Sequence, residues 1–407
     1  MERIIFIIFI SACHFLNPSF RLTTMSTFNF SPTVLEWAAN NINISWESLA
    51  EEIVTAKTKR EEKLQAAYDG KLTLKQAEKI SQKTNTPFGF LFLQEPPKLE
   101  KLTIPDLRTI TQSNPLSNDF YDTLEDIYKK VEWYRTYLET EGELEPHSFV
   151  GRFSFNKNLS VERVVEDIRH TINVDSKFFE TDSKSHYYQA LTSKIENIGI
   201  LVFTNGVVKN NPRRKLNIAE FRGFAIADKY VPAVFINNSD TLSAQLFTLM
   251  HEIAHIWLGK SGVSDANEGS EVERFCNKVS AEFLMPTKLF LEKWTFDQYE
   301  ALTYDSLSRI AEYFKVSVFA VAVKAKQLHL ITDHGVNQIK AEAIAKYQMK
   351  RLSNGGNFYA TLPYRNSKTF TNVLVNQALS QQMLLRDAAS MLNVKPNTIM
   401  QLYLRQQ

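Results

Sequence analysis

Apolar and polar residues alternate with a helical period over most of this chain. Residues 32–93 form a series of short amphipathic patterns that predict helices, one of them opened by Ser45 as N-cap and one closed by Gly70. Longer helical patterns cover residues 117–140 and 158–174. Helix, turn and helix patterns recur at 306–331 and at the C-terminus.

Continuous apolar runs of strand length interrupt the helices in the middle of the chain. "IGILVFTN" predicts a buried strand, and "FRGFAIADKYVPAVFIN" predicts two more strands that are joined across "DKYV". We therefore expect a mainly α chain with a small β-sheet, of the α+β class. The order of elements predicts four segments: residues 1–25, 26–97, 98–333 and 334–407.

The helix that follows the last strand carries the most distinctive chemistry of the sequence. "LFTLMHEIAHIWLG" places His251 and His255 four residues apart on one helical face, with Glu252 beside them. Asp240 or Ser239 is its expected N-cap, and Gly259 is expected to end it. An edge strand ending near Asn237 would offer a place for an extended substrate.

Buried polar residues in an apolar helix need a partner, and a metal ion provides one. Two imidazoles suit zinc, which takes a third protein ligand at catalytic sites. Glu252 is then the expected general base, which takes a proton from the attacking water and gives it to the leaving amine. We expect Glu282 to be the third ligand, because it lies among apolar residues in "SAEFLMP". Two satisfied core histidines are the alternative interpretation.

Other acidic and sulfur-containing side chains precede Glu282 in "EVERFCNKVSAEFLMP". Glu271 and Glu273 stand in the expected first turn of the helix, where carboxylates complement the helix dipole. Cys276 is a competing soft ligand or a buried free thiol. With Cys13 it is one of only two cysteines, which excludes a disulfide framework and suits a reducing cytosol.

These motifs together resemble the ImmA/IrrE family of zinc metallopeptidases. The resemblance rests on "FRGFAIADKYVPAVFINNSDTLSAQLFTLMHEIAHIWLG" and the helix ending in "AEFLMP". It implies a zincin-like HEXXH core, with zinc held by His251, His255 and Glu282 and with Glu252 as catalytic residue. It also implies a protein substrate, namely a transcriptional repressor or similar regulator. Some members of the family are described as antitoxins, so a toxin is a further possible partner.

The segment before this core resembles the XRE-type helix-turn-helix domain that is often fused to the family. Lys57, Lys59, Arg60 and Lys63 cluster where its recognition helix is expected to start. However, residues 27–100 contain nine Lys/Arg against ten Asp/Glu, a balance of −1, whereas DNA binding needs a basic face. DNA binding and a scaffold role are both open for this segment.

The C-terminal segment also has the helix-turn-helix layout. Residues 355–407 contain five Lys/Arg and one Asp, a balance of +4. A DNA-binding unit and a packed helical hairpin with a solvated basic face are the two interpretations.

The first residues of the chain, "MERIIFIIFISACHFL", indicate either a signal-like segment or a start codon placed too early, with Met25 as the true start. We expect a cytoplasmic protein that has no membrane partner. The main hypothesis is a zinc endopeptidase, and the rival is a non-catalytic DNA-binding regulator or antitoxin.

Overall fold

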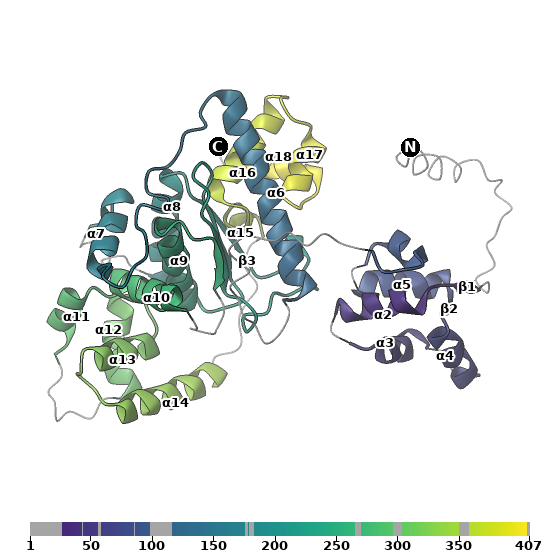
Figure 1. The fold of residues 1–407 in the computed structure, drawn as a ribbon, viewed down its shortest axis with the longest axis horizontal. Helices are drawn as coiled ribbons and strands as arrows, with labels where there is room; N and C mark the ends of the chain where they lie inside the picture. The colour runs from purple at the N-terminus through teal and green to yellow at the C-terminus, as the bar shows by residue number, and fades with distance from the viewer. Residues whose placement is uncertain are drawn as a thin grey trace. The chain divides into compact units, whose positions relative to one another are not determined.

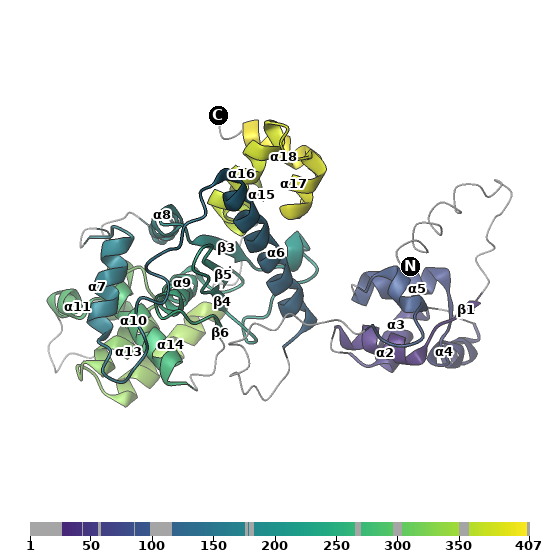
Figure 2. The same cartoon turned by 45° about the horizontal axis from the view of Figure 1, so that its top comes forward.

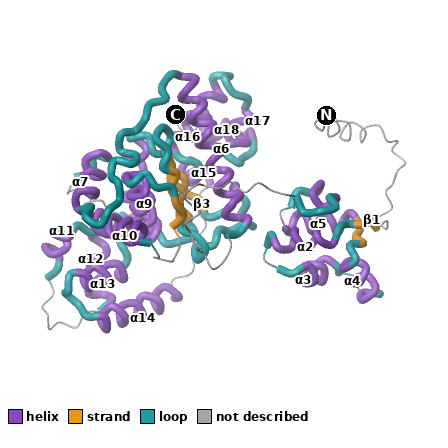
Figure 3. Tube along the Cα trace, in the orientation of Figure 1, coloured by secondary structure: helices purple, strands orange, loops and turns teal. Residues whose placement is uncertain are grey.

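The computed structural model of the chain describes residues 27–42, 44–55, 58–84, 86–97, 116–175, 178, 183–264, 270–295, 303–349 and 358–404. The chain divides into two compact units, residues 1–101 and 102–407. Helices dominate both units, as the tube in Figure 3 shows. No helix among the described residues is long and apolar enough to cross a membrane. The predicted segment 1–25 lies outside the described residues.

Within its described residues, the first unit contains four α-helices, one 3₁₀ helix and a small two-stranded antiparallel sheet. Ser45 caps its second helix as predicted, because its side chain accepts a hydrogen bond from Ser48 N. Gly70 has φ +78°, and a Cβ there would lie 2.1 Å from the carbonyl oxygen of Phe30, so only glycine fits this turn. The elements are β1 (Thr27–Asn29), α2 (Pro32–Asn40), α3 (Trp46–Ile53), α4 (Arg60–Tyr68), β2 (Lys71–Thr73), α5 (Leu74–Thr84) and the 3₁₀ helix η1 (Phe88–Phe92).

The second unit holds a four-stranded sheet between layers of helices, which confirms the α+β class. Its strands are β3 (Leu201–Asn205), β4 (Gly223–Ile226), β5 (Ala233–Asn237) and β6 (Gly262–Ser264). Its helices are α6 (Asn118–Glu141), α7 (Val161–Thr171), α8 (Lys184–Asn197), the 3₁₀ helix η4 (Val208–Asn210), α9 (Leu242–Trp257), α10 (Glu271–Leu284), α11 (Thr287–Lys293), α12 (Tyr304–Tyr313), α13 (Val318–Gln327), α14 (Asp333–Met349), α15 (Phe358–Arg365), α16 (Lys368–Leu379), α17 (Leu385–Met391) and α18 (Pro396–Leu404).

The strands of the sheet are ordered β3-β5-β4-β6. β3 and β5 are parallel, whereas β4 is antiparallel to both β5 and β6. The strand that ends at Asn237 is therefore β5, an inner strand that is paired on both sides. This corrects the expectation of an edge strand there, and the strand at the edge beyond β4 is β6.

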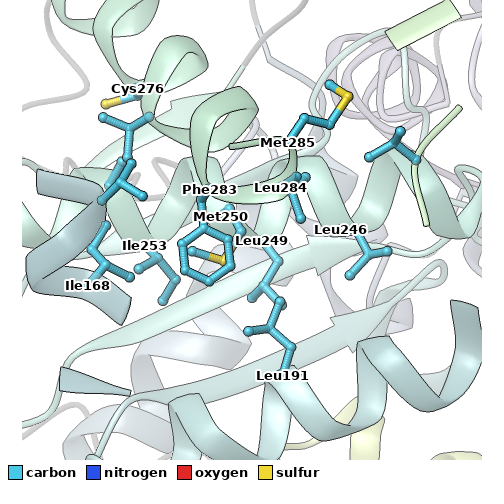
Figure 4. Packing of buried hydrophobic residues seen from close by; sticks show 14 of the residues in the cluster. Ile168, Leu191, Leu246, Leu249, Met250, Ile253, Cys276, Phe283, Leu284 and Met285 are labelled. Atoms are coloured by element: carbon cyan, nitrogen blue, oxygen red, sulfur yellow. The ribbon is translucent and has the colours of Figure 1, made fainter. Parts of the chain in front are cut away.

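Both faces of the sheet are buried, since successive residues of each strand point to opposite sides. On one side Val202, Ala225 and Val234 pack in a core with α7 to α10 and α12 to α14. On the other side Phe203, Phe224 and Phe235 pack in a core with α6 and α15 to α18. Figure 1 shows these two helical layers. Figure 4 shows the first core, where these side chains meet: Ile168, Leu191, Leu246, Leu249, Met250, Ile253, Cys276, Phe283, Leu284 and Met285.

The described residues of helices α14 to α18 pack into the two cores of the sheet and do not form a separate one. The sequence predicts a separate domain at 334–407, but α14 packs through Ile339 into the first core, whereas α15 to α18 complete the second core against the sheet. The sequence pattern of these helices shows which of their faces are apolar but not what those faces pack against, because the strands that they contact lie far away in the sequence.

Helix α9 is fixed at both of its ends. Thr241 is its N-cap and accepts a hydrogen bond from Ala244 N, one residue after the expected Asp240. Gly259, with φ +63°, follows the helix as expected, and a Cβ there would lie 2.9 Å from Gly151 Cα. Gly151 N in turn donates to the carbonyl oxygen of Ile256 at 2.9 Å. The close approach of the two glycines therefore satisfies the carbonyl oxygen of Ile256 in the last turn of α9 and fixes the end of the helix.

Candidate metal centre

The two histidines of α9 lie on one buried face, as the spacing predicts. His251 is 4% exposed and His255 is 3% exposed. Their Nε2 atoms are 3.1 Å apart, so the two rings converge on one point instead of contacting separate partners.

Glu273, in the first turn of α10, completes this group. One carboxylate oxygen lies 3.0 Å from Nε2 of His251, and the other lies 3.2 Å from Nε2 of His255. The three ligand atoms lie within 4.8 Å of one another. Burial alone would raise the pKa of Glu273, but hydrogen bonds and charge attraction from the two histidines lower it well below its ordinary value. The carboxylate is therefore ionised and able to bind a cation.

Glu282, the carboxylate that the sequence predicts as third ligand, lies elsewhere. Its oxygens accept hydrogen bonds from Lys324 Nζ at 2.6 Å and from Thr287 N at 2.8 Å. The two charged side chains are 15% and 7% exposed, so this is a largely buried ion pair. Glu282 and Glu273 are separated by about two and a half helical turns, which places them on opposite faces of α10. The cation that Glu282 needs is an ammonium group, and the prediction of Glu282 beside the histidines is corrected accordingly.

Asn277 supports the site from the next turn of α10. Its Oδ1 lies 2.9 Å from Nδ1 of His251. Because an amide oxygen only accepts, this contact places the proton of His251 on Nδ1 and leaves the lone pair of Nε2 directed at the shared point. Asn277 does not stand out in the sequence as a site residue, although Glu273 and Asn277 have the i, i+4 spacing that places them on one helical face.

Glu252 lies on the sheet side of α9. Its side chain is fully buried. A Cβ at Gly223 of β4 would lie 2.9 Å from its Oε1, 2.7 Å from Thr248 Cγ2 and 2.8 Å from the carbonyl oxygen of Phe235. Only glycine at this position of β4 therefore leaves room for the carboxylate.

Cys276 is a buried free cysteine on α10. Burial, together with the charges of Glu273 and Glu252, raises the pKa of its thiol well above the ordinary value. The side chain is a neutral part of the first core, as Figure 4 shows, and the interpretation as a buried free thiol agrees with this environment.

The arrangement fits a tetrahedral metal ion. Ligands about 2.0–2.1 Å from zinc stand about 3.3 Å from one another at tetrahedral angles. Nε2 of His251 lies 3.1 Å from Nε2 of His255 and 3.0 Å from Oε2 of Glu273, and Nε2 of His255 lies 3.2 Å from Oε1 of Glu273. In addition, Nδ1 of His255 is buried and has no hydrogen-bond partner among the described residues. The residues present thus match the donor types and the spacing of a zinc site.

The basic residues that the sequence analysis singled out in the first unit lie on and before α4. Lys59 forms an exposed ion pair with Glu62 at 3.2 Å. Arg60 and Lys63 are exposed on the helix, and Lys57 lies outside the described residues. Acidic neighbours thus compensate part of this cluster, as the balance of −1 suggests.

Comparison with known proteins identifies two regions of the chain. Residues 195–326 match the family model of the IrrE N-terminal-like domain, Peptidase M78. Residues 366–405 match a model described as a domain of unknown function, DUF8813. Neither a curated protein nor a solved structure matches the chain. The first match covers β3 to α13, including α9 and α10. Residues 195–326 are therefore a peptidase-like domain with a zincin-like core, which supports the resemblance to the ImmA/IrrE family for this part of the chain.

Proposed function

We propose that this chain is a zinc-dependent endopeptidase, with His251, His255 and Glu273 as the ligands and Glu252 as the catalytic residue. The observation that carries the proposal is the triangle of two imidazole nitrogens and one ionised carboxylate, built by two helices of a peptidase-like domain. Two core histidines that only satisfied each other would have no need of a third convergent ligand from α10.

The protein supplies positioning and proton transfer. A zinc ion at this site would polarise the scissile carbonyl and favour a nucleophilic water. Glu252 takes a proton from the attacking water and delivers it to the leaving amine. Asn277 holds His251 in the tautomer whose Nε2 is free to act as a ligand. Gly223 leaves the space in which the carboxylate of Glu252 stands.

The substrate enters the proposal as an extended peptide segment. A Cβ at Gly262, the first residue of β6, would lie 3.9 Å from the ring of His255, so this edge strand borders the site. Strand addition along β6 would carry a peptide past the ligands. As substrate we propose a transcriptional repressor or a similar regulatory protein, in line with the family resemblance, and such a substrate implies action in the cytosol.

The test is the nearly isosteric change Glu252→Gln. It should keep the bound metal and the fold and lose proteolysis by about 10²–10⁴-fold, since the amide cannot accept the proton. Parent and variant would be co-expressed with a repressor encoded beside the gene, and repressor length and promoter activity would be followed together. A repressor that is shortened only by the parent supports the proposal. If the promoter responds equally to both proteins while the repressor stays intact, the non-catalytic regulator or antitoxin is the better description.

A further inference from the structure

A basic loop follows β3 on the side of the sheet opposite the metal centre. Residues 207–216 contain four basic and no acidic side chains. Arg214 points inward and forms ion pairs with Asp119 at 2.5 Å and Asp122 at 2.6 Å, which anchors the loop to α6. Lys209, Arg213 and Lys215 are exposed, and none of them lies in an ion pair within the described part of the chain. The loop therefore presents three uncompensated positive charges.

Asn210 joins this loop to the C-terminal helices. Its Nδ2 donates to the carbonyl oxygens of Leu392 at 3.0 Å and Asn393 at 3.3 Å, directly after α17. Its Oδ1 accepts from Arg365 at 3.2 Å. Asn393 itself donates to Asp126 of α6 at 2.9 Å. Figure 2 shows α16, α17 and α18 gathered beside α6. Two segments that are distant in the sequence are thus held as one surface.

On the C-terminal side of this surface, the short helices α17 and α18 and the turn between them follow the order of a helix-turn-helix unit. α17 and α18 meet over the buried residues Ala388 and Ala389, and Asn393 adopts a left-handed conformation, φ +55°, in the turn between them. Lys395 is exposed at the start of α18, followed by the exposed side chains of Asn397 and Gln401. In such units the second helix enters the major groove, and amide side chains near its start can bind adenine bidentately.

The acidic side chains beside this surface are already paired. Asp126 contacts Lys130 at 2.5 Å, and Asp387 contacts Arg386 at 3.3 Å. Within the described residues of the loop, α17 and α18, the exposed charges that lie in no ion pair are Lys209, Arg213, Lys215 and Lys395, all of them positive. The sequence balance of +4 in residues 355–407 thus underestimates the positive charge of the folded surface, because the loop of the peptidase-like domain adds to it.

We infer that the loop 207–216 and the helices α17 and α18 together form a binding face for double-stranded DNA. α18 faces the groove, and Lys209, Arg213, Lys215 and Lys395 contact phosphates. This inference goes beyond the proposed peptidase activity and does not depend on it, since none of these residues belongs to the metal centre. It also places DNA binding on the second unit, whereas the candidate residues predicted from the sequence, Lys57, Lys59, Arg60 and Lys63, belong to the first.

The experiment measures the salt dependence of binding to a labelled duplex of mixed sequence by fluorescence anisotropy, using the full chain. The triple variant Lys209→Gln, Arg213→Gln, Lys215→Gln removes three phosphate contacts. Each contact contributes about 0.9 to the slope of log K against log salt, so the slope should fall by about 2.7. Between 50 and 200 mM salt the parent should therefore lose about 40-fold more affinity than the variant.

A matched control removes three exposed basic residues from the helices of the first core, through Lys288→Gln, Arg309→Gln and Lys340→Gln. The slope of this control should equal that of the parent. Any DNA binding by the first unit would contribute equally to the parent, the loop variant and the control.

The variant Lys395→Gln tests whether the two segments act together. It should lower the slope by about one. An unchanged slope would overturn the composite face even if the loop variant responds. The inference would be overturned altogether if the parent did not bind the duplex at 50 mM salt. It would also be overturned if the loop variant and the control lowered the slope equally. The exposed residues Leu384 and Leu385 would then make a protein the better partner.

Discussion

Glu273 and Glu282, both on α10, should respond to substitution in opposite ways. Glu273 contacts both histidines, whereas Glu282 contacts Lys324. Glu273→Gln removes one of three proposed ligands. Partners in the outer shell of a metal site alone are worth about 10–100-fold in affinity, so loss of a direct ligand should weaken zinc binding by more than about 100-fold. The fold should remain, since Gln is close to Glu in size and stays near the surface of the first turn.

Glu282→Gln leaves the ammonium group of Lys324 buried without its counter-charge. Removing one partner of a buried ion pair costs about 3–5 kcal/mol. In a unit of this size the midpoint of thermal unfolding should fall by roughly 10 °C. Zinc binding should not change, because the side chain is on the opposite face of α10 from the histidines.

The assay combines metal analysis of purified protein, competition with a chromophoric chelator, and thermal unfolding followed by circular dichroism. Glu271→Gln is the matched control, since this exposed carboxylate lies in the same first turn as Glu273. Glu271→Gln should change neither the zinc affinity nor the midpoint of thermal unfolding. The assignment would be refuted if Glu273→Gln kept a full equivalent of zinc at parent affinity, or if Glu282→Gln lost zinc while its unfolding temperature stayed the same.

Two further changes test the surroundings of the site, and a third tests the turn between β4 and β5. Gly223→Ala should reduce peptidase activity while zinc content is retained, because the new Cβ would displace the carboxylate of Glu252; activity and metal content are measured on the same preparation. Asn277→Ala should weaken zinc affinity by about 10–100-fold without unfolding, as the tautomer of His251 is no longer fixed, and chelator competition measures this. Burial would raise the pKa of Asp228, but the hydrogen-bond donors around it lower the pKa below the ordinary 3.8. The ionised carboxylate therefore stabilises the fold above that pH, and this stabilisation is lost as the pH falls further. In urea unfolding, the free energy of unfolding of Asp228→Asn should be lower than that of the parent at pH 7 and should converge with it in acid.

The sequence was most informative where a single element decides the outcome. The spacing of His251 and His255 and the apolar residues around them predict one buried helical face, and the structure has that face. The strand that ends at Asn237 was located correctly by its apolar run, but its neighbours were not. Strand order depends on pairings between β3, β5, β4 and β6, and no local pattern records them.

The choice of the third ligand shows the same limit. An apolar neighbourhood indicated that Glu282 is largely buried, which is correct, but burial alone does not identify the partner. Lys324 lies in α13, and only the fold brings it to α10. Glu273 looked like a surface residue because polar residues surround it in the sequence. Its position four residues before Asn277 was the available signal, since both face α9.

The second core has a consequence for where this protein can be divided. The match to the peptidase family ends at residue 326, before α15 to α18 begin. A chain cut there would lose the part of this core that α15 to α18 provide over Phe203, Phe224 and Phe235, and apolar surface now buried by these helices would be exposed to solvent. Such a fragment should be prone to self-association although it contains every residue of the metal centre. The boundary of the recognisable family is thus not the boundary of the folding unit.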